Sequence, residues 1–171
     1  MAKQLRGTPV QIEAPAELVW RILTDFASFP RWNPFIRRAS GELVTGQKIS
    51  VNLRLYGRTL VPFKPTITKV DAPHELRWLA RMGLPGVFDV DRFFIIEPAS
   101  PGSCTFRQGE DCTGFLAGPM LATGLEGRIL AGYERLNLAL KKRAERLAQA
   151  EAQSHPPAEE APASTPLDHR N

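Results

Sequence analysis

The sequence predicts one α+β domain in which a long C-terminal helix lies against a curved antiparallel sheet. Apolar and polar residues alternate through the middle of the chain, and Gly- and Pro-rich joints separate the runs. From residue 118 the apolar period becomes helical, and helices segregated beside an antiparallel sheet are typical of the α+β class. The 171 residues fit a single domain, and 43% apolar with 23% charged residues is an ordinary composition for a soluble protein.

The N-terminal part predicts one strand and two short helices. Residues 8–13 alternate, with Val10 and Ile12 on one face, as expected of a half-buried strand. Pro15 suits the first turn of a helix over residues 16–24. Pro30 and Pro34 then limit a second helix to about one turn.

The middle of the chain predicts the remaining strands. Residues 49–55 alternate most clearly, and residues 75–81, 87–97 and 104–113 follow the same pattern. A strand over residues 59–71 contains Pro62 and Pro65, which indicates an edge position or a bulge. Short joints between successive strands favour antiparallel hairpins.

The C-terminal part predicts a helix over residues 118–153 and then a tail. An apolar stripe recurs at helical spacing: Leu121, Leu125, Ile129, Leu136, Leu140 and Leu147. About 35 residues at roughly 1.5 Å each give roughly 50 Å, so we expect the last turns to project beyond the sheet. The domain is therefore expected over residues 1–153, and residues 154–171, rich in Pro, Ala and Glu, are expected to be disordered.

Composition argues against several classes of function. No stretch approaches the length of a membrane span, and no apolar region of a secretory signal follows the N-terminal charges, so we expect a cytoplasmic protein. Cys104 and Cys112 are eight residues apart on one expected strand, too far for a disulfide. No Cys/His cluster occurs and only His74 lies within the expected domain, so we expect no metal site, no cofactor and no Ser-His-Asp catalysis. The net charge of +4 comes from scattered basic residues, which disfavours a nucleic-acid partner.

Several short motifs stand out along the chain: Ile12-Glu13-Ala14-Pro15, Trp32-Asn33-Pro34, Glu75-Leu76-Arg77-Trp78, Gly86-Val87-Phe88-Asp89 and Thr113-Gly114-Phe115-Leu116. Together they resemble the SRPBCC (START-like) superfamily, in its polyketide cyclase/dehydrase branch. The resemblance covers about residues 8–147. It implies a helix-grip fold, a seven-stranded antiparallel sheet around the C-terminal helix with a tunnel between them. The superfamily includes lipid carriers, cyclases, hormone receptors and co-chaperone domains, so the fold does not choose the function.

Strand parity predicts three polar side chains in the interior. If Phe94 faces the helix, so does Arg92, and Gln108 and Glu110 share the inward face of the next strand with Phe106. A buried charge is costly unless it is paired, so we expect Arg92 and Glu110 to pair. Two interpretations stay open: a structural ion pair, or a polar spot that orients the end of a ligand in an apolar pocket. The resemblance implies histidines where Arg92 and Gln108 stand, and their absence weakens proton-transfer chemistry.

The expected walls of the pocket combine strand, loop and helix residues. They are Trp32, Leu53, Trp78, Phe88, Arg92, Phe94, Phe106, Gln108, Glu110, Leu121, Leu125 and Tyr133. Trp78, Phe94 and Phe106 fit a plain core equally well. Trp32 and Phe35, with the hairpin at residues 83–86, are expected at the mouth, and a local hydrophobic staple is the alternative for them. Three helix glycines, Gly124, Gly127 and Gly132, indicate either close packing or vacant volume.

These features favour a protein that binds or carries a hydrophobic small molecule, lipid-like or polycyclic. The first alternative is a cofactor-independent polyketide cyclase or dehydratase, in which Arg92 polarises a carbonyl and Glu110 acts as base. The second is a co-chaperone-like interaction module that uses the outer face of the sheet or the extended helix, with its charged turns at residues 141–146.

Overall fold

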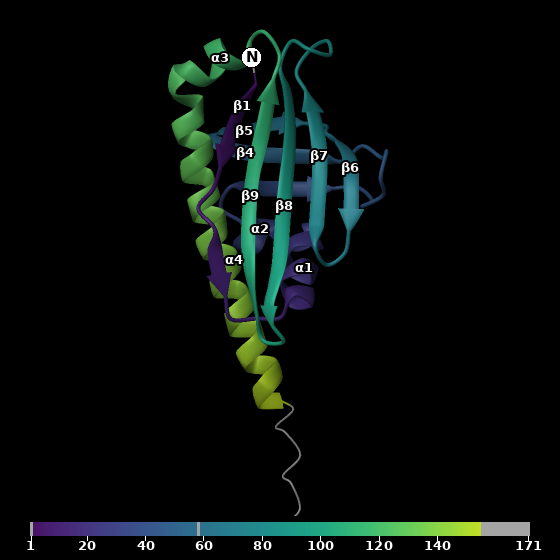
Figure 1. Ribbon diagram of the computed structural model, residues 1–171, viewed down its shortest axis with the longest axis vertical. Coiled ribbons are helices and arrows are strands. Elements are labelled where there is room, and N and C mark those ends of the chain that lie inside the picture. Colours follow the sequence, from purple (N-terminus) through teal and green to yellow (C-terminus); the bar gives the residue numbers. More distant parts are fainter. Residues whose placement is uncertain (1, 58, 155–171) are drawn as a thin grey trace, which may run out of the picture.

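The computed structural model describes residues 2–57 and 59–154, and in this part of the chain two antiparallel sheets enclose one long helix (Figure 1). The strands are β1 (Lys3–Arg6), β2 (Val10–Ile12), β3 (Ile36–Ser40), β4 (Ser50–Tyr56), β5 (Thr59–Phe63), β6 (Thr66–Asp71), β7 (Glu75–Arg81), β8 (Asp89–Ser100) and β9 (Ser103–Thr113). The helical elements are α1 (Ala16–Thr24), η1 (Phe26–Ser28), α2 (Phe29–Trp32), α3 (Ala117–Met120), the π-helical segment η2 (Leu121–Leu125) and α4 (Glu126–Ser154).

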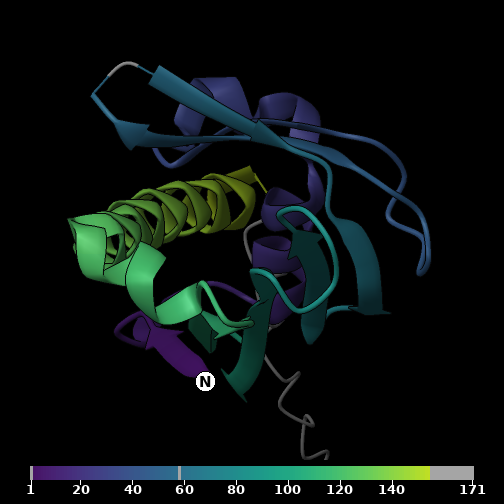
Figure 2. The same cartoon turned by 90° about the horizontal axis from the view of Figure 1, so that it is seen from above.

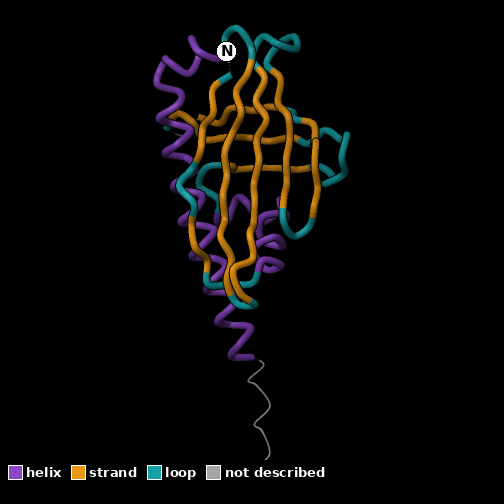
Figure 3. Tube along the Cα trace, in the orientation of Figure 1, coloured by secondary structure: helices purple, strands orange, loops and turns teal. Residues whose placement is uncertain are grey.

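The larger sheet has the order β1-β9-β8-β7-β6, and β2 also pairs with β9. The smaller sheet has the order β3-β4-β5, and its strands cross those of the larger sheet (Figure 3). An isolated bridge between Lys48 and Thr66 joins the two, together with a hydrogen bond from Ile49 N to Pro65 O of 3.0 Å. Helix α4 therefore lies between two layers, with β4 on one side and β1, β2 and β9 on the other (Figure 2).

The α+β class and the helix-grip architecture are confirmed, but one strand is additional and one expected strand is divided. The chain has β1 before the expected first strand, and Gly7 N donates to Gln108 O between β1 and β2. The expected strand over residues 59–71 ends at Phe63 and resumes at Thr66, so the described chain holds nine strands rather than seven. Pro65 has no N–H for a ladder, and at this point the chain passes from one sheet to the other. Pro62 lies on β5, an edge strand, as predicted.

The long C-terminal helix is confirmed, although it is not one uninterrupted helix. Gly124, inside η2, has φ +85°, a left-handed conformation that kinks the chain just before α4. Within α4 a buried stripe faces the sheets: Ile129, Gly132, Tyr133, Leu136, Asn137, Leu140 and Ala144. Helix α4 extends to Ser154, so the predicted disordered tail, apart from this residue, lies outside the described residues.

The short N-terminal helices close one end of the interior. Helix α1 buries Leu18, Val19, Ile22 and Leu23, and Asp25 ends it. The rings of Phe26, Phe29 and Trp32 form a chain of edge contacts with centroids 5.3 and 5.4 Å apart. Both cysteines lie on β9 without a disulfide, as predicted, and both are buried. Among the described residues, no helix is both long and apolar enough to cross a membrane.

Candidate functional site

The centre of the interior is a buried ion pair between β8 and β9. Arg92 is directly opposite Glu110 in the register, and its Nη1 donates to Glu110 Oε1 at 2.6 Å. Its Nη2 donates to Gln108 Oε1, also at 2.6 Å. Arg92 is 1% exposed, Gln108 1% and Glu110 4%. The predicted inward parity of all three residues and the predicted pairing are confirmed.

Aromatic rings surround the guanidinium on its remaining sides. The Cζ atom of Arg92 lies 4.7 Å from the ring centroid of Tyr133, 4.8 Å from that of Phe94 and 5.3 Å from that of Phe35. A cation near the face of an aromatic ring is attracted by the ring quadrupole, more strongly where water is excluded. The rings therefore offset part of the cost of removing the charge from water.

Gln108 connects this pair to α4. Its Nε2 donates to Asn137 Oδ1 at 2.5 Å and to the Tyr133 carbonyl at 3.2 Å. Asn137 Nδ2 in turn donates to Thr8 O at 2.8 Å, which joins the helix to the segment between β1 and β2. Asn137 was not among the site residues predicted from the sequence. The feature that could have indicated it is a polar residue four positions after Tyr133, on a helix face that is otherwise apolar.

Three polar atoms around Arg92 have no hydrogen-bond partner. They are Nε of Arg92 itself, Nε1 of Trp78 and the Tyr133 hydroxyl. Trp78 is the cross-strand neighbour of Arg92 on β7, and both are 1% exposed. Burial, with the negative charge of Glu110 as the next cause, raises the pKa of Tyr133 well above its ordinary value, so its hydroxyl stays protonated.

The other residues expected to line a pocket are mostly in the core. Five are 3% exposed or less: Trp78, Phe88, Phe94, Phe106 and Leu121. Leu53 is 8% exposed, and Trp32 and Leu125 are partly buried against the same core. Burial fits both interpretations that the sequence left open, and their contact with a ligand stays a prediction.

Phe35 is not at a mouth, contrary to the prediction. It is fully buried, and its ring meets that of Tyr133 edge-on with centroids 5.9 Å apart. The preceding Asn33 accounts for this, because its Oδ1 accepts from Phe35 N at 3.0 Å and from Ile36 N at 2.8 Å. This local turn directs the aromatic ring inward, and residue spacing alone did not reveal it.

Two loops lie at the α3 end of the larger sheet (Figure 1), and both instead carry exposed apolar side chains. Leu84 is 75% exposed and Met82 48% in the β7–β8 loop, and Phe115 is 69% exposed after β9. The loops are joined, since Phe115 N donates to Gly86 O at 3.1 Å and Leu116 N to Val87 O at 3.0 Å. The loop at residues 83–86 thus belongs to an exposed apolar rim, formed with Phe115 and Leu116.

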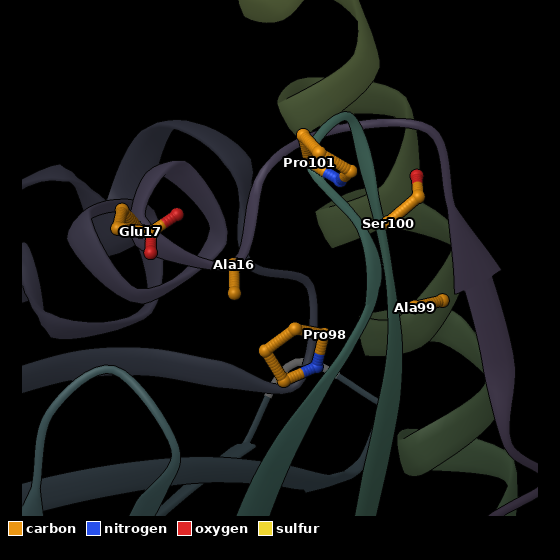
Figure 4. A pocket seen from close by; sticks show the side chains of 6 residues that line it. All are labelled: Ala16, Glu17, Pro98, Ala99, Ser100 and Pro101. Carbon is orange, nitrogen blue, oxygen red and sulfur yellow. The ribbon is translucent and has the colours of Figure 1, made fainter.

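Two surface hollows lie away from this interior. One, of about 270 Å³, is formed by Ala16 and Glu17 at the start of α1 and by residues 98–101 of the β8–β9 hairpin (Figure 4). The other, of about 230 Å³, lies over Ser50–Asn52 and Pro62–Lys64. None of the residues expected to bind ligand lines either hollow.

The outer face of the larger sheet is stabilised separately. Asp91 accepts from Arg77 Nη1 at 3.2 Å, and burial raises its pKa. Phe93 shares this face, and the guanidinium groups of Arg6 and Arg77 lie 4.8 and 5.2 Å from its ring centroid. Phe93 was not among the residues predicted from the sequence. A feature that could have indicated it is Gly109, the cross-strand partner of Phe93 on β9, because a residue without a side chain leaves room for the aromatic ring.

Comparison with known proteins identifies the family. Residues 7–145 match the family described as "Polyketide cyclase / dehydrase and lipid transport". The chain belongs to this family. No curated protein sequence matches the chain.

Solved structures share the fold at low sequence identity. A START superfamily protein from Mycobacterium smegmatis is 23% identical with a TM-score of 0.62, over 84% of this chain and 98% of that one. The Zhui aromatase/cyclase from Streptomyces sp. R1128 is 17% identical with a TM-score of 0.62, over 92% and 99%. Norcoclaurine synthase from Thalictrum flavum is 16% identical with a TM-score of 0.55, over 81% and 95%. At these identities the similarity concerns the fold, which the helix-grip prediction anticipated.

Proposed function

We propose that this protein binds a hydrophobic small molecule, lipid-like or polycyclic, between α4 and the larger sheet. The observation that carries the proposal is the buried Arg92 cluster, a small polar group with unpartnered donors inside an otherwise apolar interior. Small-molecule sites combine these two features, because apolar walls supply affinity and a few polar groups fix orientation. Membership of a family that includes lipid transport supports the same function.

The exposed apolar rim supports a route of entry at the α3 end of the sheet. Val90, Met120 and Leu125 are partly buried against the core, at the start of β8 and in the α3–η2 segment. They provide apolar surface between the rim and the interior. Since Arg92 and Tyr133 are closed to solvent, entry requires movement of the segments that cover them, and we expect association to be slower than for an open site.

Native mass spectrometry of the freshly purified protein, with displacement of an apolar fluorescent dye, tests the proposal. We expect a co-purified mass or saturable dye binding. Leu125→Arg places a charge at the partly buried entrance and should abolish dye binding. Leu138→Arg is the matched control, because Leu138 is 65% exposed on α4. No bound mass together with no saturable dye site would refute the proposal.

A second candidate is a cyclase or dehydratase, as the family description allows. Its supporting observation is that Glu110 and Tyr133 lie at the same buried guanidinium, which could hold a carbonyl beside a proton donor. Turnover of a polyketide-like substrate that falls in Glu110→Gln, with binding retained, would favour the enzyme. Unchanged turnover would exclude Glu110 as the base.

The third alternative, a protein-interaction module, has less support. Lys141 Nζ donates to Gln11 O at 2.7 Å and to Glu145 Oε1 at 2.6 Å, and Glu145 also accepts from Glu13 N at 3.0 Å. Two of the charged groups expected to meet a partner thus hold α4 against β2 within the same chain. A cytoplasmic location and the lack of a nucleic-acid partner stay predictions from composition.

A further inference from the structure

The fold gathers basic residues on the outer face of the smaller sheet. Residues 31–64 hold seven basic residues and one acidic residue, whereas the rest of the chain holds 15 and 17. Buried side chains of β4 face α4, so the residues that alternate with them lie on the opposite face, an outer layer of the molecule (Figure 2). This parity and the strand register define a basic face that carries Arg38, Lys48, Arg54 and Lys64.

The protein does not neutralise these charges itself. Among the described residues, none of the four forms an ion pair, and Nε of Arg54 has no hydrogen-bond partner. The outer face of the larger sheet differs, because Arg77 pairs with Asp91 there and Arg107 pairs with Glu97. The basic face therefore presents a concentrated positive potential, which attracts anions.

The hollow of about 230 Å³ described above opens on the basic face. Ser50, Asn52 and Lys64 line it, which brings a hydroxyl, an amide and an ammonium group around one space. Neither Ser50 nor Asn52 uses its side chain in a hydrogen bond within the described part of the chain. Pockets for whole ligands begin at roughly 300 Å³, so this hollow suits a single polar group.

A phosphate monoester matches these groups better than other anions do. It carries about −1.5 to −2 charges and three acceptor oxygens, one for each kind of donor at the hollow. A carboxylate is bound best by the planar fork of an arginine, and no arginine lines the hollow. A phosphodiester, as in nucleic acid, has fewer free oxygens and less charge. The donor set therefore favours a terminal phosphate group.

We propose that the basic face binds a phosphate monoester, with its phosphate held in the hollow by Ser50, Asn52 and Lys64. Arg38 lies next to the hollow, since it is opposite Asn52 in the register, and it adds to the attraction. The site is on the side of the smaller sheet away from α4, so it is separate from the proposed apolar ligand site. A lipid headgroup and a soluble ester present the same phosphate atoms to these residues.

Two phosphate monoesters of different source test the proposal with the full chain. Flotation measures binding to phosphatidylcholine vesicles that contain phosphatidate, and calorimetry measures binding of glycerol 3-phosphate. Vesicles of the same surface charge made with phosphatidylglycerol, and a single-stranded oligonucleotide without a terminal phosphate, supply phosphodiesters. We expect the phosphatidate vesicles to bind about tenfold more tightly than either phosphodiester.

The two monoesters also distinguish the source of the phosphate. Binding to phosphatidate vesicles without binding of glycerol 3-phosphate would support a lipid headgroup as the ligand. Binding of glycerol 3-phosphate that displaces the protein from the vesicles would support a soluble ester. Equal binding to monoester and phosphodiester vesicles, tightest binding to the oligonucleotide, or no binding to any of the probes would overturn the proposal.

Two variants assign the binding to the hollow. Ser50 and Lys64 are exposed, so both variants should fold. Lys64→Gln should weaken monoester binding about fivefold, because one positive charge beside the phosphate is lost. Ser50→Ala removes a donor without changing the charge, so monoester binding should weaken about threefold while phosphodiester binding stays the same.

Arg107→Gln is the matched control for charge. It removes one positive charge from the larger sheet, where Arg107 pairs with Glu97, and should leave monoester binding unchanged. Equal losses in Lys64→Gln and Arg107→Gln would overturn the proposal, because net charge alone would then explain the binding. A monoester preference that survives both Lys64→Gln and Ser50→Ala would also overturn it.

Discussion

A Cβ atom on Gly132 would lie 2.3 Å from Cδ2 of Phe35. Helix α4 can approach the start of β3 this closely only because Gly132 has no side chain. Phe35 in turn lies against Tyr133 and Arg92, so this contact fixes the rear wall of the candidate site. Of the two explanations that the sequence offered for the helix glycines, close packing is correct at Gly132.

Gly132→Ala should destabilise the protein although alanine favours helices. Overpacking of a close contact costs about 1–3 kcal/mol, which exceeds the gain of about 1 kcal/mol in helix propensity. Phe35 is fully buried and has little room to move. Equilibrium urea denaturation measures the difference, and a variant as stable as the wild type would show that Phe35 can shift without cost.

Gly124→Ala should also destabilise the protein, through the backbone alone. Gly124 has φ +85°, and a Cβ added there would meet no heavy atom within 4 Å, so the cost is that of a left-handed residue, about 1–2 kcal/mol. Gly127→Ala is the matched control. Its Cβ would also meet nothing and its φ is ordinary, so the control should be stabilised by up to about 1 kcal/mol. Equal midpoints for the two variants in a denaturation experiment would contradict the assignment.

Arg92→Leu should destabilise the protein by about 3–5 kcal/mol, because Glu110 would stay buried without its partner. Replacing both residues by leucine should cost less than the single change, since no unpaired charge is then left. Arg107 and Glu97 provide the control on the same two strands. They lie 3.0 Å apart but are 49% and 51% exposed, so Arg107→Gln should cost under about 1 kcal/mol. Similar losses for Arg92→Leu and Arg107→Gln would contradict the role given to burial.

Stability should fall as the pH rises above 9. Burial raises the pKa of Cys104 to about 11 and that of Cys112 to about 12, from an ordinary value of 9.0. As the pH rises above 9.0 towards the folded-state pKa values, the thiols of the unfolded chain lose their protons before those of the folded protein, which favours unfolding. Below pH 9.0 the thiols are protonated in both states and contribute no pH dependence. The free energy of unfolding, measured at pH 8, 9 and 10, should fall more steeply for the wild type than for a Cys104→Ala/Cys112→Ala variant. If the free energy of unfolding fell equally with pH in both proteins, burial would not raise the pKa of these thiols.

The polar centre of the site was predictable because strand periodicity is strict. Once Phe94 and Phe106 are assigned to the inward face, Arg92, Gln108 and Glu110 must share it, and antiparallel neighbours with short joints bring them together. Partners from distant elements were not predictable in this way. Asn137 reaches Gln108 from 29 residues away, and only packing of α4 brings them into contact.

The sequence by itself determined the class, the family resemblance, the inward parity of Arg92 with Glu110, and the long C-terminal helix. These depend on local periodicity, which the chain carries in every window of a few residues. The tertiary structure alone decided that Pro65 divides one expected strand between two sheets, that Gly124 breaks the helix, and that Phe35 lies in the core. It also decided that Trp78 and Tyr133 leave their donors without partners beside Arg92. Such features depend on which distant surfaces meet, and no local pattern encodes that choice.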